Sequence, residues 1–220
     1  MEKITLIFKH ESRDGVNVLN DLPENIRKVL LKIASIFSSK RIKWVLVGST
    51  ASHLHGLNIV PKDIDILVEL KRVYEVDELL ASRLNIIRRV KQSSDRLYSS
   101  HYGVFEAHNV KVEVMADLKM RREYGVLKLD FDEIYSFSKE IKVNGVCIRV
   151  IPLEWQLVAN LMIPGKERRV KAILTLLKVK GIEREVLDSV LRHASVDVKD
   201  IVLKLLRSSN LLRTEFNTLP

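Results

Sequence analysis

Cysteine is nearly absent from this sequence of 220 residues, in which Cys147 is the single example. One cysteine cannot form a disulfide within the chain, and it excludes every metal site that is built from several thiolates. This composition is typical of a reducing, cytoplasmic location. We expect Cys147 to be a small buried hydrophobic residue.

Long apolar runs are also absent. No stretch approaches the roughly 18 consecutive apolar residues that a membrane-spanning helix needs. The N-terminus also lacks a basic segment followed by an uninterrupted apolar run. The sequence therefore predicts a soluble intracellular protein without a membrane partner. Its hydrophobic content of 46% is ordinary for a globular fold.

Acidic residues are fewer than basic ones: 37 Lys and Arg against 28 Asp and Glu give a formal net charge of +9. Such an excess attracts phosphates regardless of sequence and favours a nucleic-acid or polyphosphate partner. It is also typical of an ordinary solvated surface, so the partner stays open. Glutamine is limited to Gln92 and Gln156 while 30% of residues are charged, a bias also found in thermophile proteins.

Apolar periodicity predicts helices and strands in turn through the first two thirds of the chain. Helical spacing occupies residues 23–38, for which Asp21 is the expected cap, then 49–54, ended by Gly56, and 73–84. Strand patterns occupy residues 42–47, 63–69, 97–106, 110–116 and 125–131, and Asn144-Gly145 marks a hairpin turn. Residues 1–20 are expected to form a small hairpin or an irregular arm.

The pattern changes at Pro152, after which only helical periodicity follows. It occupies residues 153–162, 168–178, 184–193 and 196–206. The sequence therefore predicts an α/β domain over residues 1–150 and a C-terminal helical bundle over residues 151–220.

Three acidic residues carry the most specific chemical signal. Asp63 and Asp65 are two positions apart on a predicted strand, so both side chains point to one face. Glu113 faces away from the apolar side of the strand at 110–116. Paired carboxylates repel unless a cation or water compensates, and carboxylates from neighbouring strands suit one or two magnesium or manganese ions. We predict these three residues as metal ligands, with Asp117 as the alternative third ligand.

A phosphate-binding turn is predicted just before these acids. Gly48 and Ser49 lie where a buried strand passes into a short helix. Glycine permits close approach of the backbone, and the helix start presents free N–H groups to an anion. Ser49 or Thr50 would add a hydroxyl contact.

These features together resemble the signature of the nucleotidyltransferase superfamily related to DNA polymerase beta. The match consists of a hydrophobic strand ending in Gly48-Ser49, 13 intervening residues, the segment Asp63-Ile64-Asp65-Ile66, and later Val112-Glu113-Val114. It covers about residues 25–117. The resemblance implies a mixed sheet flanked by helices and two-metal catalysis. It also implies transfer of a nucleoside monophosphate from a nucleoside triphosphate to a hydroxyl, amine or phosphate.

Within that superfamily the chain is similar to the small minimal-type enzymes. The similar pieces are GSTASHLHG, PKDIDILV and PLEWQLVANLMIPGKERRVKAI. Such enzymes include AbiEii-like toxins of toxin–antitoxin systems and lincosamide-type antibiotic transferases. Those relatives often carry an Arg-x-Lys-Asp pattern in the helical part. Here residues 168–172 contain Arg168 and Lys171 but no aspartate after the lysine.

Other conspicuous residues have ordinary explanations. His53 and His55 lie two positions apart on a helix and face different sides, so we expect surface or packing roles rather than metal binding. Trp44 and Trp155 belong to no aromatic series that would stack bases, and we expect both to pack. Lys62 is expected to be an exposed loop residue. Basic residues that would form a rim for RNA, or simply a solvated surface, are Arg88-Arg89, Lys119, Arg121-Arg122 and 166–171.

The leading hypothesis is a magnesium- or manganese-dependent nucleotidyltransferase that uses ATP or another nucleoside triphosphate. Its acceptor is left open among RNA, a protein and a small molecule. Glu113, or Asp117 in its place, would help to deprotonate the acceptor. The alternative is an inactive, transferase-like module that binds nucleic acid or protein, and a third reading is a related phosphotransferase.

Overall fold

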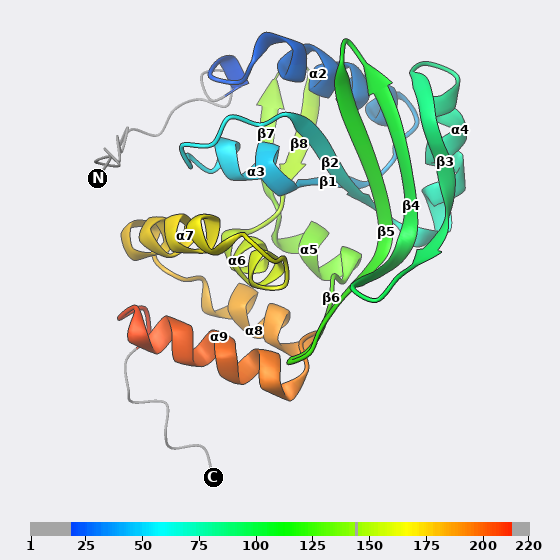
Figure 1. The fold of residues 1–220 in the computed structure, drawn as a ribbon. Helices are drawn as coiled ribbons and strands as arrows, with labels where there is room; N and C mark the ends of the chain where they lie inside the picture. Colours follow the sequence, from blue (N-terminus) through cyan, green and yellow to red (C-terminus); the bar gives the residue numbers. More distant parts are fainter. Residues whose placement is uncertain (1–18, 144, 213–220) are drawn as a thin grey trace.

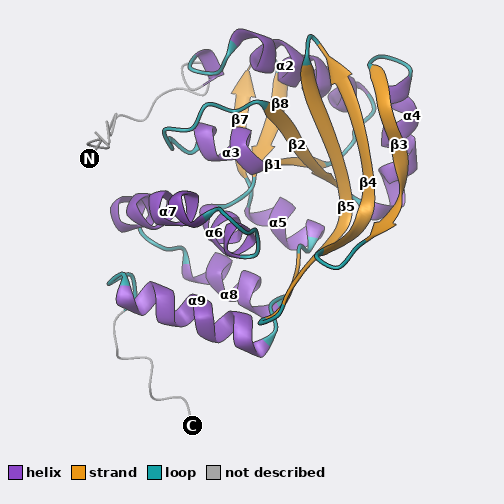
Figure 2. Ribbon diagram, in the orientation of Figure 1, coloured by secondary structure: helices purple, strands orange, loops and turns teal. Residues whose placement is uncertain are grey.

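A computed structural model describes residues 19–143 and 145–212 of the chain (Figures 1 and 2). All but the last two residues of the predicted N-terminal arm fall outside this range. In the described part, no helix is both long enough and apolar enough to cross a membrane.

Eight strands of the described chain form one mixed sheet in the order β3-β4-β5-β2-β1-β8-β7, with β6 paired to β5. The strands are β1 (Trp44–Val47), β2 (Asp63–Val68), β3 (Asn85–Ser94), β4 (Tyr98–Ala107), β5 (Val110–Arg122), β6 (Gly125–Lys128), β7 (Lys139–Val143) and β8 (Val146–Val150). Two pairs, β2 with β5 and β1 with β8, are parallel, and the other pairs are antiparallel. The predicted mixed sheet is confirmed.

Helices flank the sheet and make up the C-terminal part (Figure 2). They are α2 (Glu24–Ser39), α3 (Gly48–Leu54), α4 (Val73–Ala81), α5 (Phe131–Phe137), α6 (Leu153–Leu161), α7 (Glu167–Lys180), α8 (Arg184–Arg192) and α9 (Val196–Ser208), with a short 3-10 turn η1 (Leu70–Arg72) before α4. Helix α2 packs on β8, β2 and β5, and α4 packs on β3 and β4. The four helical segments predicted after Pro152 are confirmed.

The local pattern of β2 explains how its acids are displayed. Ile64, Ile66 and Val68 are fully buried on one face. Asp63 and Asp65 are half-buried on the other face. Burial of each large aliphatic side chain is worth about 1.5–3 kcal/mol, so the three apolar residues fix which face the aspartates occupy. A slip of one residue would reverse both faces.

Several expectations need correction. Pro23, not Asp21, occupies the cap position of α2. Strand β3 was not predicted, because its sequence NIIRRVKQSS is mostly exposed at the sheet edge and lacks regular alternation. The strand predicted over 125–131 ends at Lys128, and α5 begins at Phe131 after Asp130, whose carboxylate accepts a bond from the Glu133 N–H at 3.2 Å. Cys147 is half-buried rather than buried.

Both tryptophans pack in the interior, as predicted. Trp44 is 4% exposed and meets Phe37 edge to face, with ring centroids 5.7 Å apart. Trp155 is fully buried, and its indole N–H donates to the Ser189 hydroxyl at 3.0 Å, which joins α6 to α8. Buried residues of the α/β part and of the helical part belong to one hydrophobic cluster. A domain boundary near residue 150 stays a prediction.

The two histidines also have structural roles. A ring nitrogen of His53 lies 2.7 Å from the carbonyl oxygen of Ile59. A ring nitrogen of His55 lies 2.6 Å from the carbonyl oxygen of Ile151, at the end of β8. Burial lowers the pKa of His55 to about 4, so this residue is neutral at physiological pH. These contacts agree with the surface or packing roles expected for both residues.

The indole–hydroxyl bond between α6 and α8 gives a stability test. Trp155→Phe leaves the buried Ser189 hydroxyl without its donor and should cost roughly 1–3 kcal/mol of unfolding free energy beyond the loss of packing. Chemical denaturation measures this cost. In the double variant Trp155→Phe/Ser189→Ala the loss should be smaller than the sum of the two single losses, because no unpaired hydroxyl remains. Additive losses would contradict the bond.

Candidate active site

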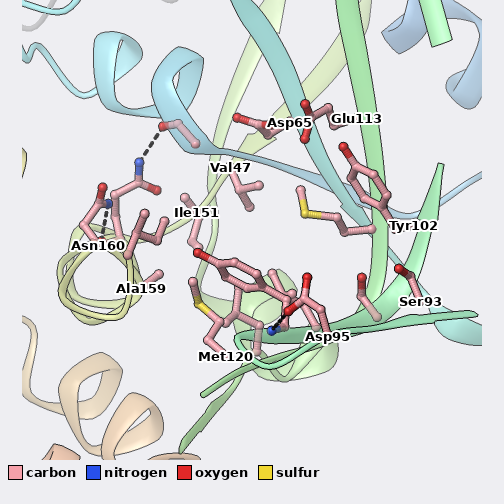
Figure 3. A pocket seen from close by; sticks show the side chains of 18 of the residues that line it. Val47, Asp65, Ser93, Asp95, Tyr102, Glu113, Met120, Ile151, Ala159 and Asn160 are labelled. Carbon is pink, nitrogen blue, oxygen red and sulfur yellow. Dashed lines mark hydrogen bonds between the residues drawn. The ribbon is translucent and has the colours of Figure 1, made fainter. Parts of the chain in front are cut away.

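The three predicted acids meet on one face of the sheet. Asp65 of β2 and Glu113 of β5 are direct partners in the parallel pair, and Asp63 precedes Asp65 by two residues. Each residue offers a carboxylate oxygen, and these oxygens lie within 4.8 Å of one another. Asp65 and Glu113 point into the same cleft (Figure 3). Three hard oxygen donors at this separation suit magnesium or manganese, which bind carboxylates in preference to softer ligands.

Asp117 lies apart from this cluster. Ala116 pairs with His101 and Lys119 pairs with Ser99, so β5 contains one extra residue at this point. Asp117 takes a left-handed backbone conformation there, with φ of 50°. Its carboxylate faces Lys119 at 3.4 Å and Lys128 at 3.9 Å. The bulge thus re-aims Asp117, and the geometry favours Glu113 as the third acid.

The turn at Gly48 and Ser49 is built around the two aspartates. Gly48 has φ of +69°, and an added Cβ would lie 1.8 Å from the Asp65 carboxylate oxygen Oδ2, so no other residue can stand there without displacing Asp65. The Ser49 hydroxyl donates to Asp63 Oδ1 at 2.8 Å, and its backbone N–H donates to Asp65. The turn therefore holds both aspartates in place.

Thr50 supports the turn from inside the fold. It is fully buried, and its hydroxyl donates to the backbone oxygen of Asp63 at 2.6 Å. This bond ties α3 to the start of β2. We assign the hydroxyl of Thr50 to positioning the strand, and contact with a phosphate stays a prediction for Gly48, Ser49 and Thr50.

A buried glutamine joins the helical part to this turn. Gln156 of α6 is 2% exposed, and its side-chain amide donates to the Gly48 carbonyl oxygen and to the Ser52 hydroxyl, both at 2.6 Å. Sequence reasoning did not single out Gln156, because a glutamine in an apolar helical pattern has no distinctive motif.

The electrostatics of the cluster are unfavourable without a cation. Burial raises the pKa of Asp65 to about 8, and the neighbouring charges of Asp63 and Glu113 add to this increase. The charge of Arg169 and the Ser49 N–H oppose it only in part. Tyr102 shares a hydrogen bond with Glu113, and burial together with that carboxylate raises the pKa of Tyr102. The phenol therefore remains a hydrogen-bond donor to Glu113 at physiological pH.

Asp65 and Glu113 open into a cleft of about 400 Å³ between the sheet and helices α6 and α7, whereas Asp63 does not line it. Its apolar lining includes Leu118, Met120, Leu129, Ile151 and Ala159. Two arginines reach it from opposite sides, Arg88 from β3 and Arg169 from α7. The cleft can therefore take a flat apolar group and anionic groups together.

The predicted basic rim is divided among several surroundings. Arg88 and Arg169 line the cleft, whereas Arg168 and Lys171 are exposed and do not. Arg89 faces α4, where it pairs with Asp77 at 2.6 Å and with Glu78. The sequence offered no signal that separates Arg88 from Arg89, because bulges in β3 decide which of them faces the cleft.

Comparisons with known proteins agree with this geometry. The family model for aminoglycoside-2″-adenylyltransferase matches residues 29–173. A candidate nucleotidyltransferase of known structure from Thermotoga maritima is 28% identical, with a TM-score of 0.56 over 72% of this chain and 94% of that chain. The nucleotidyltransferase ANT(2″)-Ia, solved in complex with adenylyl-2″-tobramycin, is 12% identical, with a TM-score of 0.46 over 83% of this chain and 97% of that chain. Proteins with curated descriptions gave no match.

The raised pKa of Asp65 predicts a pH-dependent effect on stability. In chelator-treated protein, an unfolded aspartate ionises near pH 3.8, whereas folded Asp65 keeps its proton to about pH 8. Stability is therefore fully present below pH 4 and is lost as pH rises toward 8. Asp65→Asn removes this loss. It should raise Tm at pH 8 by at least roughly 2–4 °C, the shift produced by about 1 kcal/mol in a chain of this size.

Differential scanning calorimetry at pH 4 and pH 8 measures this effect, and the difference between variant and wild type should vanish at pH 4. Asp117→Asn is the matched control, because Asp117 faces two lysines and its loss should not raise Tm. A lower Tm for Asp65→Asn at pH 8 would contradict the raised pKa.

Proposed function

The chain belongs to the aminoglycoside-2″-adenylyltransferase family of nucleotidyltransferases, and from this premise we propose that it transfers a nucleoside monophosphate from a nucleoside triphosphate to an acceptor hydroxyl. The observation that carries the proposal is the cluster of Asp63, Asp65 and Glu113 beside the Gly48-Ser49 turn. Magnesium or manganese is the expected cofactor.

The reaction exchanges one bond for another at the α-phosphorus. The acceptor oxygen loses its proton and forms a bond to that phosphorus, while the bond to the oxygen that bridges to the β-phosphate breaks. Pyrophosphate leaves with the electron pair of that bond. Divalent cations held by the three carboxylates would neutralise phosphate charge. Glu113, which receives a hydrogen bond from Tyr102, is the candidate to accept the proton.

The other groups of the cleft would hold the triphosphate. Gly48 and Ser49 would let the phosphate oxygens approach the protein backbone closely. Arg169 adds positive charge on the side of α7. Gln156 keeps the turn in place through the Gly48 carbonyl. The apolar residues on the sheet and on α6 offer a surface for a nucleobase or for an apolar part of the acceptor. An aminoglycoside, an RNA end and a protein hydroxyl are all candidate acceptors at this stage.

Substitutions that keep size but remove charge test the assignment. Asp63→Asn, Asp65→Asn and Glu113→Gln should each lower nucleotidyl transfer by at least roughly 100-fold, because charge on the reacting phosphates is no longer compensated. Each triphosphate is supplied with label in the α-phosphate, with magnesium or manganese, and label in the acceptor is counted. Asp117→Asn should keep its activity.

Two outcomes would overturn the proposal. Transfer retained by both Asp63→Asn and Asp65→Asn would remove the role of the carboxylates. In a parallel assay with the label in the γ-phosphate, label that reaches the acceptor from the γ-labelled and not from the α-labelled triphosphate would identify a phosphotransferase.

A further inference from the structure

Sheet register places an arginine in line with the carboxylate cluster. Val47 pairs with Asp65, Asp65 with Glu113, Glu113 with Val104, and Val104 with Arg88. Directly paired residues share a face of the sheet. The row therefore runs across five strands, from the strand that ends at Gly48 to Arg88 on the edge strand β3. Arg88 lies two strands beyond Glu113, or about 10 Å at the usual strand spacing.

Arg88 has most of its hydrogen-bonding capacity to spare. Within the described residues it donates one bond, to the Ser93 hydroxyl at 3.3 Å, and its guanidinium lies over the Tyr102 ring, 5.3 Å from the centroid. No carboxylate of the described chain pairs with it. A guanidinium carries five N–H donors, so a half-buried one in a cleft is well suited to an anionic oxygen.

The charged residues that line the cleft are three acids and two arginines, Arg88 and Arg169. Besides Asp65 and Glu113, Asp95 is the acid that lines the cleft. Its Oδ1 already accepts from the backbone N–H groups of Leu97 and Tyr98, both at 2.7 Å. Arg121 and Arg122 lie near Asp95, and Arg122 is placed over the Tyr98 ring. Once cations compensate Asp65 and Glu113, the charged side chains that remain in the lining are Asp95, Arg88 and Arg169, and a polycationic acceptor would then meet more positive charge than negative charge.

The expected direction of the reaction determines the side from which the acceptor approaches, and Arg88 lies on that side. If the triphosphate tail lies against Gly48 and Ser49, the leaving pyrophosphate departs toward β1. Attacking and leaving oxygens lie roughly in line in this chemistry. The acceptor must then approach from the opposite side, over β5 and β4, where Arg88 stands.

We propose that the acceptor carries an anionic group, in the first place a phosphate, beside its reacting hydroxyl, and that Arg88 binds this group. The inference rests on the proposed function and narrows its acceptor class. It excludes a polycationic aminoglycoside as the preferred acceptor. The phosphate could belong to a small phosphomonoester or to an RNA strand that ends in a free hydroxyl, because both present the same chemistry to the guanidinium.

Paired acceptors with and without the anionic group test the proposal and separate the two sources. One pair is a hexose phosphate and the same hexose without phosphate. The other is a short oligoribonucleotide with a free 3′-hydroxyl and its uncharged methylphosphonate analogue. A polycationic aminoglycoside is the third arm. For each, kcat and KM of transfer are measured, together with equilibrium binding in the presence of magnesium and a non-reacting triphosphate analogue.

Wild-type protein should prefer the phosphate-bearing member of at least one pair, and the pair in which this occurs identifies the source. Arg88→Gln should raise the KM and the dissociation constant of that member roughly 10- to 100-fold, as expected for loss of a charge-assisted bond. Arg89→Gln is the matched control from the other face of β3. It lowers stability by breaking the pair with Asp77 but should leave the preference ratio unchanged.

Three results would overturn the acceptor proposal. They are equal binding of both members of each pair, a preference that survives in Arg88→Gln, and tightest binding of the aminoglycoside. A failure of the proposed function itself would look different. The wild-type protein would then show no magnesium-dependent binding of the triphosphate analogue.

Discussion

Mutual repulsion among three carboxylates is the constraint on which this site depends. Asp63, Asp65 and Glu113 bring oxygens within 4.8 Å of one another in half-buried surroundings, an arrangement that is unfavourable in itself. The buried apolar face of β2 and the parallel pairing with β5 force the three together. Bonds from Ser49 to both aspartates relieve part of the repulsion. A cation bound between the carboxylates would offset the repulsion that remains.

Gly48 links the carboxylate cluster to the C-terminal helices. Its missing side chain leaves room for the Asp65 carboxylate, and its carbonyl oxygen accepts a bond from Gln156 of α6. The C-terminal helices are thereby bonded to the turn whose next residue, Ser49, donates its backbone N–H to Asp65. One short turn thus sets the distance between the carboxylates on the sheet and Arg169 on α7.

Sequence reasoning reached the acids and the fold class because both leave local marks. Alternation in residues 63–69 places Asp63 and Asp65 on one face, and the spacing to Gly48 is characteristic of the family. Tyr102 could not be identified in this way, and Arg88 could be named only as part of a basic run with Arg89. Their place in the cleft depends on bulges and on pairing between strands, which are set by tertiary packing and leave no pattern in the sequence. Asp117 was left open for the same reason, because the bulge in β5 is invisible before the partner strand is known.

The parallel pairing of β2 with β5 has a consequence for how the protein acquires its activity. Asp65 and Glu113 are direct neighbours in space, yet the hairpin of β3 and β4 and the helix α4 separate them along the chain. Bringing together two strands so far apart in the chain costs loop-closure entropy before the contacts stabilise the fold. We therefore expect these contacts to form late in folding. A partly folded chain has the aspartate pair and lacks the third acid. A metal ion that needs all three carboxylates could therefore bind only to a chain whose central sheet is complete.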